Sequence, residues 1–237
     1  MQILADYHTH TIYSHGKGTI EENVKEAILK GIKTIGISDH GYKHMTYGIK
    51  LKNLKKMREE IDALKVKYPQ IDILLGMECN ILDEHGNIDI NDEVKDLCDY
   101  IMAGYHFGSA PKSFKSLLNH CDNFIRKSEK AKEHNTKAII NAMKKNDIFI
   151  ITHPGDKGDV YIEEIAKVAK ETDTRLEINS SHGFLNCDQI NKIKHLGNKF
   201  IIGSDAHVPN NVGNFELAMK IAKESNLDLS LIENIKL

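Results

Sequence analysis

The sequence predicts one α/β domain over residues 1–237, folded as a closed or nearly closed (β/α) barrel with seven strands. Three observations predict this fold. Short apolar runs alternate seven times with helical patterns, and a chain of 237 residues can bury one sizeable core. Most of the 13 histidines lie at or just beyond the ends of the apolar runs, where a barrel of parallel strands carries its site.

Seven apolar runs have the length and composition of buried strands. Because a helical pattern separates each run from the next, we expect parallel strands joined by right-handed crossovers. The predicted strands cover residues 3–7, 34–38, 71–77, 100–105, 147–152, 175–179 and 199–204.

The helices are predicted from apolar spacing and from their end signals. Thr19 to Glu22 has the form of a capping box, and Gly31 is placed to end the first helix in a left-handed turn. The polar stretch 113–145 is expected to hold two helices that meet near Asn135. Turn residues in 82–90 predict a small hairpin or excursion. Further helices are expected at residues 51–68, 94–97, 162–169, 187–196 and 215–222.

Composition and charge argue against several classes of protein. The net charge is -2, and lysine and glutamate alternate along the predicted helices, so a nucleic-acid partner is not expected. No apolar run reaches the length of a membrane span, and the first residues do not resemble a signal peptide, so we expect a cytoplasmic protein. The four scattered cysteines are expected to be buried thiols. A homo-oligomer is left open.

Histidine and acidic side chains recur where the predicted strands end. His8 and His10 are two residues apart in an extended segment, which points both imidazoles to the same side. The carboxyl ends of the strands carry His8, His10, His15, His40, Glu78, His106, His153, His182, Asp205 and His207. The other histidines fall in excursions or on predicted helices and are expected to face solvent: His44, His85, His120, His134 and His195.

This set of residue types predicts a metal centre. Imidazoles with a few carboxylates and no thiolate suit zinc, iron(II) or manganese. A catalytic zinc commonly has three protein ligands, so nine or ten ligands support three ions. Glu78 and Asp205 follow strands directly, and a carboxylate can bridge two ions.

The motifs at the strand ends resemble those of the PHP (polymerase and histidinol phosphatase) family, nearly end to end. The residues that carry the resemblance are His8-Thr9-His10, His15, Ser38-Asp39-His40, Gly76-Met77-Glu78, Gly104-Tyr105-His106, His153-Pro154 and Gly203-Ser204-Asp205-Ala206-His207. His153-Pro154-Gly155 and residues 176–181 are further similar to the stand-alone bacterial phosphoesterase branch. That branch includes trinuclear zinc phosphatases. The resemblance implies a distorted (β/α)7 TIM-like barrel with its metal site at the carboxyl ends of the strands.

The resemblance also implies roles for individual residues. One ion would be held by His8, His10, Glu78 and Asp205, a second by Glu78, His106 and His153, and a third by His15, His40 and His207. The ions would be Zn²⁺, with Mn²⁺ or Fe²⁺ as alternatives. A metal-bound hydroxide would attack a small-molecule phosphate monoester in line, which places Glu78, Asp205 and His207 in the catalytic centre.

Two further residues have open roles. His182 is expected to contact the substrate or donate a proton, with an ordinary loop histidine as the alternative. Asp39 is expected either to orient a ligand imidazole or to cap a loop.

Other functions remain open from the sequence. Histidinol phosphate is the best-known family substrate, but specificity lies in loops that the sequence does not place. A non-catalytic, metal-stabilised binding module is a different class. An amidohydrolase barrel would want a bridging lysine after the fourth strand and leaves Glu78, His15 and His40 unexplained. An exonuclease would show a basic groove, which the charge balance does not support.

Arginine is scarce in this chain. Arg58 and Arg126 fall inside predicted helices, and Arg175 begins the sixth strand, at the end of the barrel opposite the metals. We therefore expect the ions to hold the phosphate, without the arginine fork that phosphate sites commonly use. Lys17, Lys43 and Lys157 are candidate helpers on rim loops, with plain solvation as the alternative for each.

Overall fold

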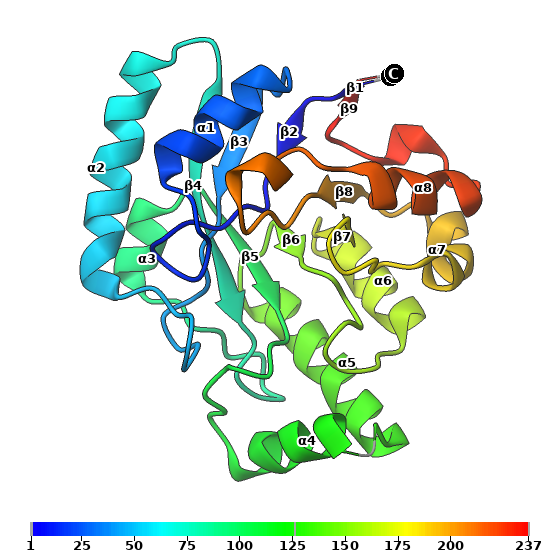
Figure 1. Cartoon of the computed structure of the whole chain (residues 1–237). Coiled ribbons are helices and arrows are strands. Elements are labelled where there is room, and N and C mark those ends of the chain that lie inside the picture. Colours follow the sequence, from blue (N-terminus) through cyan, green and yellow to red (C-terminus); the bar gives the residue numbers. More distant parts are fainter. Residues whose placement is uncertain (1, 126, 237) are drawn as a thin grey trace.

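A computed structural model describes residues 2–125 and 127–236. Seven parallel strands lie side by side in chain order and form a nearly closed barrel, so the expected distorted (β/α)7 architecture is confirmed (Figure 1). The barrel strands are β2 (Ala5–Asp6), β3 (Thr34–Ile37), β4 (Asp72–Asn80), β5 (Tyr100–Gly104), β6 (Ile150–Ile151), β7 (Arg175–Asn179) and β8 (Phe200–Gly203).

Helices lie outside the barrel and connect its strands (Figure 1). They are α1 (Ile20–Leu29), α2 (Leu51–Lys67), α3 (Asp92–Leu97), α4 (Phe114–Ile125), α5 (Glu129–Lys145), α6 (Ile162–Glu171), α7 (Cys187–Ile193) and α8 (Glu216–Glu224), with short 3-10 helices η1 (Lys194–Leu196), η2 (Pro209–Asn211) and η3 (Leu229–Leu231). The expected capping box begins α1, where Glu22 N donates to Thr19 Oγ1 and Thr19 N donates to Glu22 Oε2. Gly31 follows this helix with φ 75°, as its position predicted. No helix in the described residues combines the length and apolarity needed to cross a membrane.

Two predicted boundaries are wrong. The helices in 113–145 do not meet near Asn135: α4 ends at Ile125, and Ser128 caps α5 by accepting a hydrogen bond from Ala131 N at 3.2 Å. Asn135 lies buried inside α5 and pairs with α4, so its polarity serves tertiary packing. Likewise β4 does not end before Glu78 but continues to Asn80. The extra pairing with β5, in which Glu78 lies opposite Met102, explains the longer strand.

The barrel interior changes character along its axis. Near the amino ends of the strands, Met102, Ile150 and Ile201 form a small apolar cluster with Tyr7 and Phe149 packed against it. Farther along the barrel axis, β4, β7 and the segment after β2 carry buried polar groups, including His8, Glu78, Glu177 and Asn179. Side chains alternate along a strand, so Glu177 and Asn179 share a face, as do Glu78 and Asn80. The apolar cluster therefore forms the floor beneath a polar centre.

The seam of the barrel lies between β2 and β8, which do not pair as strands. Loop residues join the two sides at the rim, where His10 N donates to Ala206 O at 2.8 Å. At the other end, the Asn234 amide spans the seam: Nδ2 donates to Ala5 O at 2.7 Å and to Ile202 O at 2.8 Å. Its Oδ1 accepts from Ile202 N at 3.1 Å. A two-stranded antiparallel sheet of β1 (Gln2–Ile3) and β9 (Ile235–Lys236), which the sequence did not predict, lies beside it.

Asn234→Ala is expected to lower the free energy of unfolding by about 2 kcal/mol or more, because it leaves three buried backbone groups without their partner. Urea unfolding measured by circular dichroism would show the loss. The control is Asn191→Ala, which truncates an exposed asparagine on α7. Equal stability of the two variants would show that the amide does not hold the seam.

Candidate metal centre

A cavity of about 460 Å³ opens at the carboxyl ends of the strands. Glu78 reaches it from β4, and the other polar residues come mainly from the loops that follow the strands. Its lining includes His15, His40, His44, Glu78, His106, His153, His182, Asp205 and His207. His8 and His10 are buried within contact distance of Glu78 and Asp205. The structure thus brings together all ten of the predicted rim residues.

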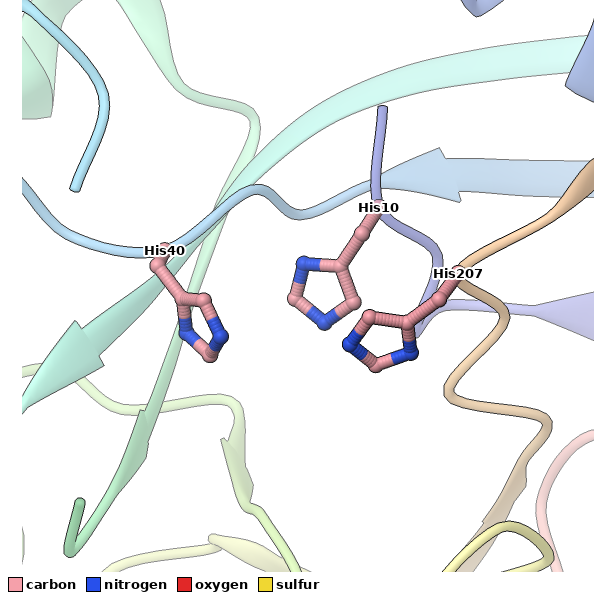
Figure 2. A group of neighbouring side chains, drawn as sticks. All are labelled: His10, His40 and His207. Carbon is pink, nitrogen blue, oxygen red and sulfur yellow. The ribbon is translucent and has the colours of Figure 1, made fainter. Parts of the chain in front are cut away.

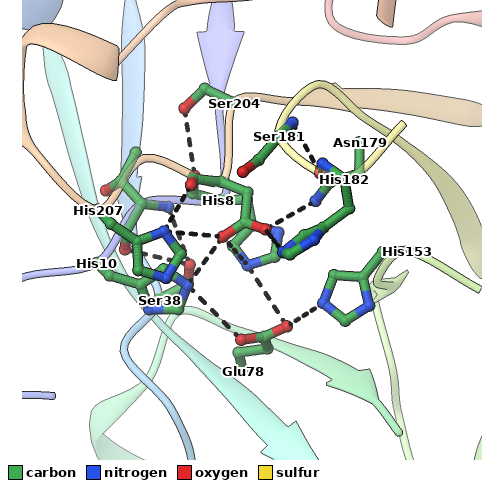
Figure 3. A network of polar contacts seen from close by, with 12 residues as sticks. His8, His10, Ser38, Glu78, His153, Asn179, Ser181, His182, Ser204 and His207 are labelled. Atoms are coloured by element: carbon green, nitrogen blue, oxygen red, sulfur yellow. Dashed lines mark hydrogen bonds and ion pairs between the residues drawn. The ribbon is translucent and has the colours of Figure 1, made fainter. Parts of the chain in front are cut away.

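The Glu78 carboxylate is completely buried, and Figure 3 shows its contact with the His153 ring. Its Oε1 lies 3.1 Å from His106 Nε2, 3.1 Å from His153 Nε2 and 3.4 Å from His8 Nε2. On the other side, Oε2 lies 2.8 Å from His40 Nδ1. One carboxylate therefore faces imidazoles on both of its oxygens, as a group shared by two cations would.

Asp205 provides the second acidic group. Its Oδ1 lies 3.3 Å from His10 Nε2 and 3.5 Å from His8 Nε2. His207 follows two residues later, and its ring packs 4.5 Å from that of His10, measured between centroids (Figure 2). His15 packs 4.2 Å from the His207 ring.

Four groups of three residues have ligand atoms that all lie within 4.8 Å of one another. Within the described residues, these groups are His8, His10 and Asp205; His8, Glu78 and His153; His40, Glu78 and His106; and His10, His40 and His207. Neighbouring groups share His8, His10, His40 or Glu78. The arrangement is therefore one continuous cluster of donors with room for more than one cation.

Several of these donor atoms have no hydrogen-bond partner although they are buried. Seven such atoms belong to the cluster: His8 Nε2, His10 Nδ1, His10 Nε2, His15 Nδ1, His40 Nδ1, Glu78 Oε2 and Asp205 Oδ1. Leaving a buried polar atom unpaired costs about 1–3 kcal/mol, so a cluster of them is not explained by packing alone. His40 Nδ1 and Glu78 Oε2 approach each other without the alignment of a hydrogen bond. Divalent cations would satisfy these atoms, and the residues fit such ions.

The protonation states also suit cations. Burial would raise the pKa of Glu78, but the charges of the surrounding histidines hold it well below its ordinary value. Burial lowers the pKa of His106 to about 4 and that of His15 to about 3, so both rings are neutral near pH 7. For His8, the nearby carboxylates outweigh burial and raise the pKa well above its ordinary value. The acidic groups thus favour positive charge at this point, whether a proton or a metal supplies it.

Glu177 is a positioning residue that the sequence reading missed. Its Oε1 lies 2.6 Å from His8 Nδ1, and its Oε2 accepts a hydrogen bond from His153 N at 2.8 Å. Asn80 holds His106 in the same way, with Oδ1 2.9 Å from Nδ1. Contacts of this kind fix the ring orientation of metal-binding histidines. The signal was present, since Glu177 and Asn179 are polar residues on one face of a strand predicted to be buried.

The backbone has an unusual conformation just after two of the barrel strands, at the edge of this centre. His153 has φ 27° and Asp205 has φ 52°, values that few residues other than glycine adopt. Each is the second residue after a barrel strand, His153 after β6 and Asp205 after β8. Such conformations cluster at functional sites, where surrounding contacts hold them in place.

The two residues with open roles are now placed. His182 lines the cavity and is one-third exposed, with Nε2 3.2 Å from Asp205 Oδ2. Asp39 accepts hydrogen bonds from Thr11 N at 2.7 Å and from the Ser14 hydroxyl, while His10 Nδ1 is 4.0 Å away. Asp39 therefore caps the loop that leads to His15, which is the second of its two expected roles.

His44 was expected to face solvent, and this prediction is wrong. Its ring is buried and stacks on His40 with centroids 4.9 Å apart, and Nδ1 accepts a hydrogen bond from Tyr47 N at 3.1 Å. The excursion after β3 folds back over the rim because Gly108 leaves space: a Cβ there would lie 2.0 Å from His44 Cε1. Of the other four histidines, His85 and His195 are exposed, whereas His120 and His134 are half-buried.

The arginines lie away from the cluster where they are described. Arg58 pairs with Asp62 and Asp99, and Arg175 pairs with Glu233. Arg175 also lines a separate cavity of about 760 Å³ that includes Tyr7 and Phe149. Arg126 lies outside the described residues. Of the three candidate lysines, Lys157 lines the cavity at the carboxyl ends of the strands.

Known proteins resemble this chain in sequence and fold. The family model described as PHP domain matches residues 6–181. A protein named "Probable phosphatase" from Thermoanaerobacter sp. (strain X514) is 37% identical over 250 residues, covering 99% of this chain and 91% of its own length. Another protein of that name from Clostridium acetobutylicum is 32% identical over 249 residues, with 99% and 91% covered.

A solved structure shares the fold. It is histidinol phosphate phosphatase from Lactococcus lactis, solved with zinc, L-histidinol and phosphate, and it covers 95% of this chain and 95% of its own at a TM-score of 0.63. Its sequence identity is 17%, so this likeness concerns the fold alone. The family match and the two relatives extend over most of the chain, and the resemblance read from the motifs is confirmed. This chain belongs to the PHP domain family.

Proposed function

We propose that this PHP-family phosphatase hydrolyses small-molecule phosphate monoesters at a centre of three divalent ions, with Zn²⁺ first and Mn²⁺ or Fe²⁺ as alternatives. One observation carries the proposal: buried donor atoms without hydrogen-bond partners converge at the cavity, around the carboxylates of Glu78 and Asp205. Such a donor set suits catalytic zinc and related ions.

The proposed ligand sets are those that the resemblance to the family implies, and the clustering of the donors supports parts of each set. His8, His10, Glu78 and Asp205 would hold one ion; Glu78, His106 and His153 a second; and His15, His40 and His207 a third. The first set is supported by the group of His8, His10 and Asp205. The second is supported by the equal 3.1 Å distances from Glu78 Oε1 to His106 and His153. For the third, the rings of His15 and His40 are stacked 4.8 Å apart.

Bound ions would supply activated water and neutralise charge on the phosphoryl group. The protein residues would do the rest. Glu78 would offset the charge of the cations, and Glu177 would fix the orientation of the His8 ring. His182, at the partly open edge of the cavity beside Asp205, is placed to contact the phosphate or the leaving group. Lys157 is partly neutralised by Asp156, with Nζ 2.5 Å from Oδ2, which suits an auxiliary role.

The cavity wall also includes aromatic side chains. Tyr47 stacks on His15 with centroids 4.4 Å apart, and Phe107 lies on the same lining. The leaving group of the ester would rest against this wall. A panel of phosphomonoesters with aliphatic, aromatic and imidazole leaving groups, histidinol phosphate included, tests the substrate class directly. Metal binding without turnover of any ester would favour the binding module instead.

Elemental analysis of protein purified without chelator is expected to give close to three transition-metal ions per chain, one for each of the three proposed ligand sets. Dialysis against a strong chelator should remove the ions and the activity together. A content of one ion or none would contradict the trinuclear centre.

Glu78→Gln is expected to lower turnover of p-nitrophenyl phosphate by at least about a hundredfold, because it removes the charge that faces two of the proposed ions. Circular dichroism should still show a folded barrel. Glu59→Gln, at an exposed position on α2, is the matched control and should keep parent activity. Parent-like turnover by the Glu78 variant would refute its bridging role.

Glu177→Gln is expected to weaken metal affinity by about 10–100-fold, since the carboxylate that orients His8 is lost while the proposed ligands remain. Competition with a chromophoric chelator measures this without reference to activity. Glu164→Gln, exposed on α6, serves as control. Unchanged affinity in the Glu177 variant would mean that His8 is held by other contacts.

A further inference from the structure

Helix α4 packs with its polar side inward and its apolar side outward. It lies at the lower edge of the molecule in Figure 1. Its buried side chains are Ser116, Asn119 and Asn123, whereas its exposed side chains include Phe114, Leu117, Leu118, Cys121, Phe124 and Ile125. Cys121 was expected to be a buried thiol, and this expectation is wrong. An amphipathic helix of a single-chain protein normally has the reverse orientation.

Hydrogen bonds hold α4 in this orientation. Asn119 Nδ2 donates to Asn135 Oδ1 at 2.8 Å, and Asn123 Nδ2 donates to the same oxygen at 2.9 Å. Ser116 Oγ donates to Glu84 Oε2 at 3.0 Å. Rolling the helix to bury its apolar side would break all three bonds and expose groups that now pair. The outward apolar face is therefore built into the fold.

The exposed apolar area is large for a surface that meets only water. Phe114 is 75% exposed, Phe124 78% and Ile125 74%, with Leu117 and Leu118 near one half. Together these side chains expose on the order of 700 Å², which exceeds the usual patch of a monomer and approaches the roughly 800 Å² per partner of a standard interface.

The spacing and charges of α4 fit a second copy of the same helix. Its outward residues recur every three or four positions, as in a coiled-coil seam. Segment 114–125 has one lysine and one aspartate, Lys115 and Asp122, seven residues apart and so on one flank of the seam. Within the chain, Lys115 Nζ lies 3.7 Å from Glu84 Oε1, and Asp122 accepts a hydrogen bond from the Ser128 hydroxyl. In an antiparallel pair related by a two-fold axis, each Lys115 would in addition face the Asp122 of the other copy. The apolar flank, Leu117 and Phe124, would likewise meet itself.

We propose that α4 forms the interface of a two-fold symmetric homodimer in which the two α4 helices pack antiparallel. A membrane surface is the other apolar partner to consider. Helices that lie on membranes carry a polar face rich in lysine and arginine. The polar face of α4 is instead directed into its own domain and is uncharged, and the flank of the stripe balances one cation with one anion.

Dimerisation at α4 would act on the metal cavity. His120, on α4, has Nε2 2.6 Å from Phe107 O and Nδ1 2.7 Å from Tyr105 Oη. Phe107 and Gly108 line the cavity, and the Phe124 ring packs 5.8 Å from that of Phe107. A partner helix on α4 therefore supports one wall of the site from outside.

Sedimentation of the full metal-loaded chain tests the proposal. The parent protein is expected to dimerise, and Leu118→Glu is expected to raise the dimer dissociation constant by about 30-fold or more, the size typical of a buried interface residue. Val66→Glu, 83% exposed on α2, places the same charge on an unrelated apolar position and should leave the dimer intact. A monomeric parent at all concentrations, or a dimer unaffected by Leu118→Glu, would overturn the proposal.

Two further experiments test the orientation of the helices. Lys115→Asp should weaken the dimer, and adding Asp122→Lys should restore it, since the exchanged charges pair again across the two-fold axis. A short bismaleimide should link the parent through Cys121 and should fail with Cys121→Ser. Failure of both the rescue and the cross-link would overturn the antiparallel arrangement. A monomer that co-sediments with anionic phospholipid vesicles, and loses this with Leu118→Glu, would identify a membrane as the partner and refute the dimer.

Discussion

The polar centre depends on how the Glu78 carboxylate is accommodated. A fully buried charge is costly unless it is paired and hydrogen-bonded, and Glu78 meets imidazoles on both oxygens. Those imidazoles are in turn fixed by groups behind them, Glu177 for His8 and Asn80 for His106. Glu177 lies on β7 and Asn80 on β4, so the barrel strands fix the orientation of the imidazoles that surround Glu78.

The apolar floor of the barrel makes this arrangement possible. Met102, Ile150 and Ile201 fill the barrel interior below the centre, so the polar side chains of β4 and β7 gather near the rim. Burying apolar residues there stabilises the closed barrel, which offsets the cost of gathering charged and polar groups at its mouth. The apolar floor and the polar centre thus occupy different levels of the same barrel and are supplied by different strands.

Much of the fold could be predicted because the spacing of apolar residues along the sequence reflects which side chains are buried. The seven strands were identified from apolar runs, and the rim histidines from their position just after those runs. The predictions failed where tertiary contacts overrode local pattern. Asn135 reads as a break in a helix but pairs with α4, and His44 reads as a loop histidine but folds over the rim beside Gly108. The β1–β9 pair joins the two ends of the chain, and no local pattern reports a contact of that range.

The seam between β2 and β8 has a consequence for how the protein is made. His8 and His10 leave the ribosome almost two hundred residues before Asp205, which lies beside both rings. Asn234, which joins Ala5 to Ile202, is later still. The cluster of donors therefore cannot assemble before Asp205 has been synthesised. Pairings of such long range also form slowly, so the full set of donors is available to a cation only after residues 205 and 234 have been made and the barrel has closed.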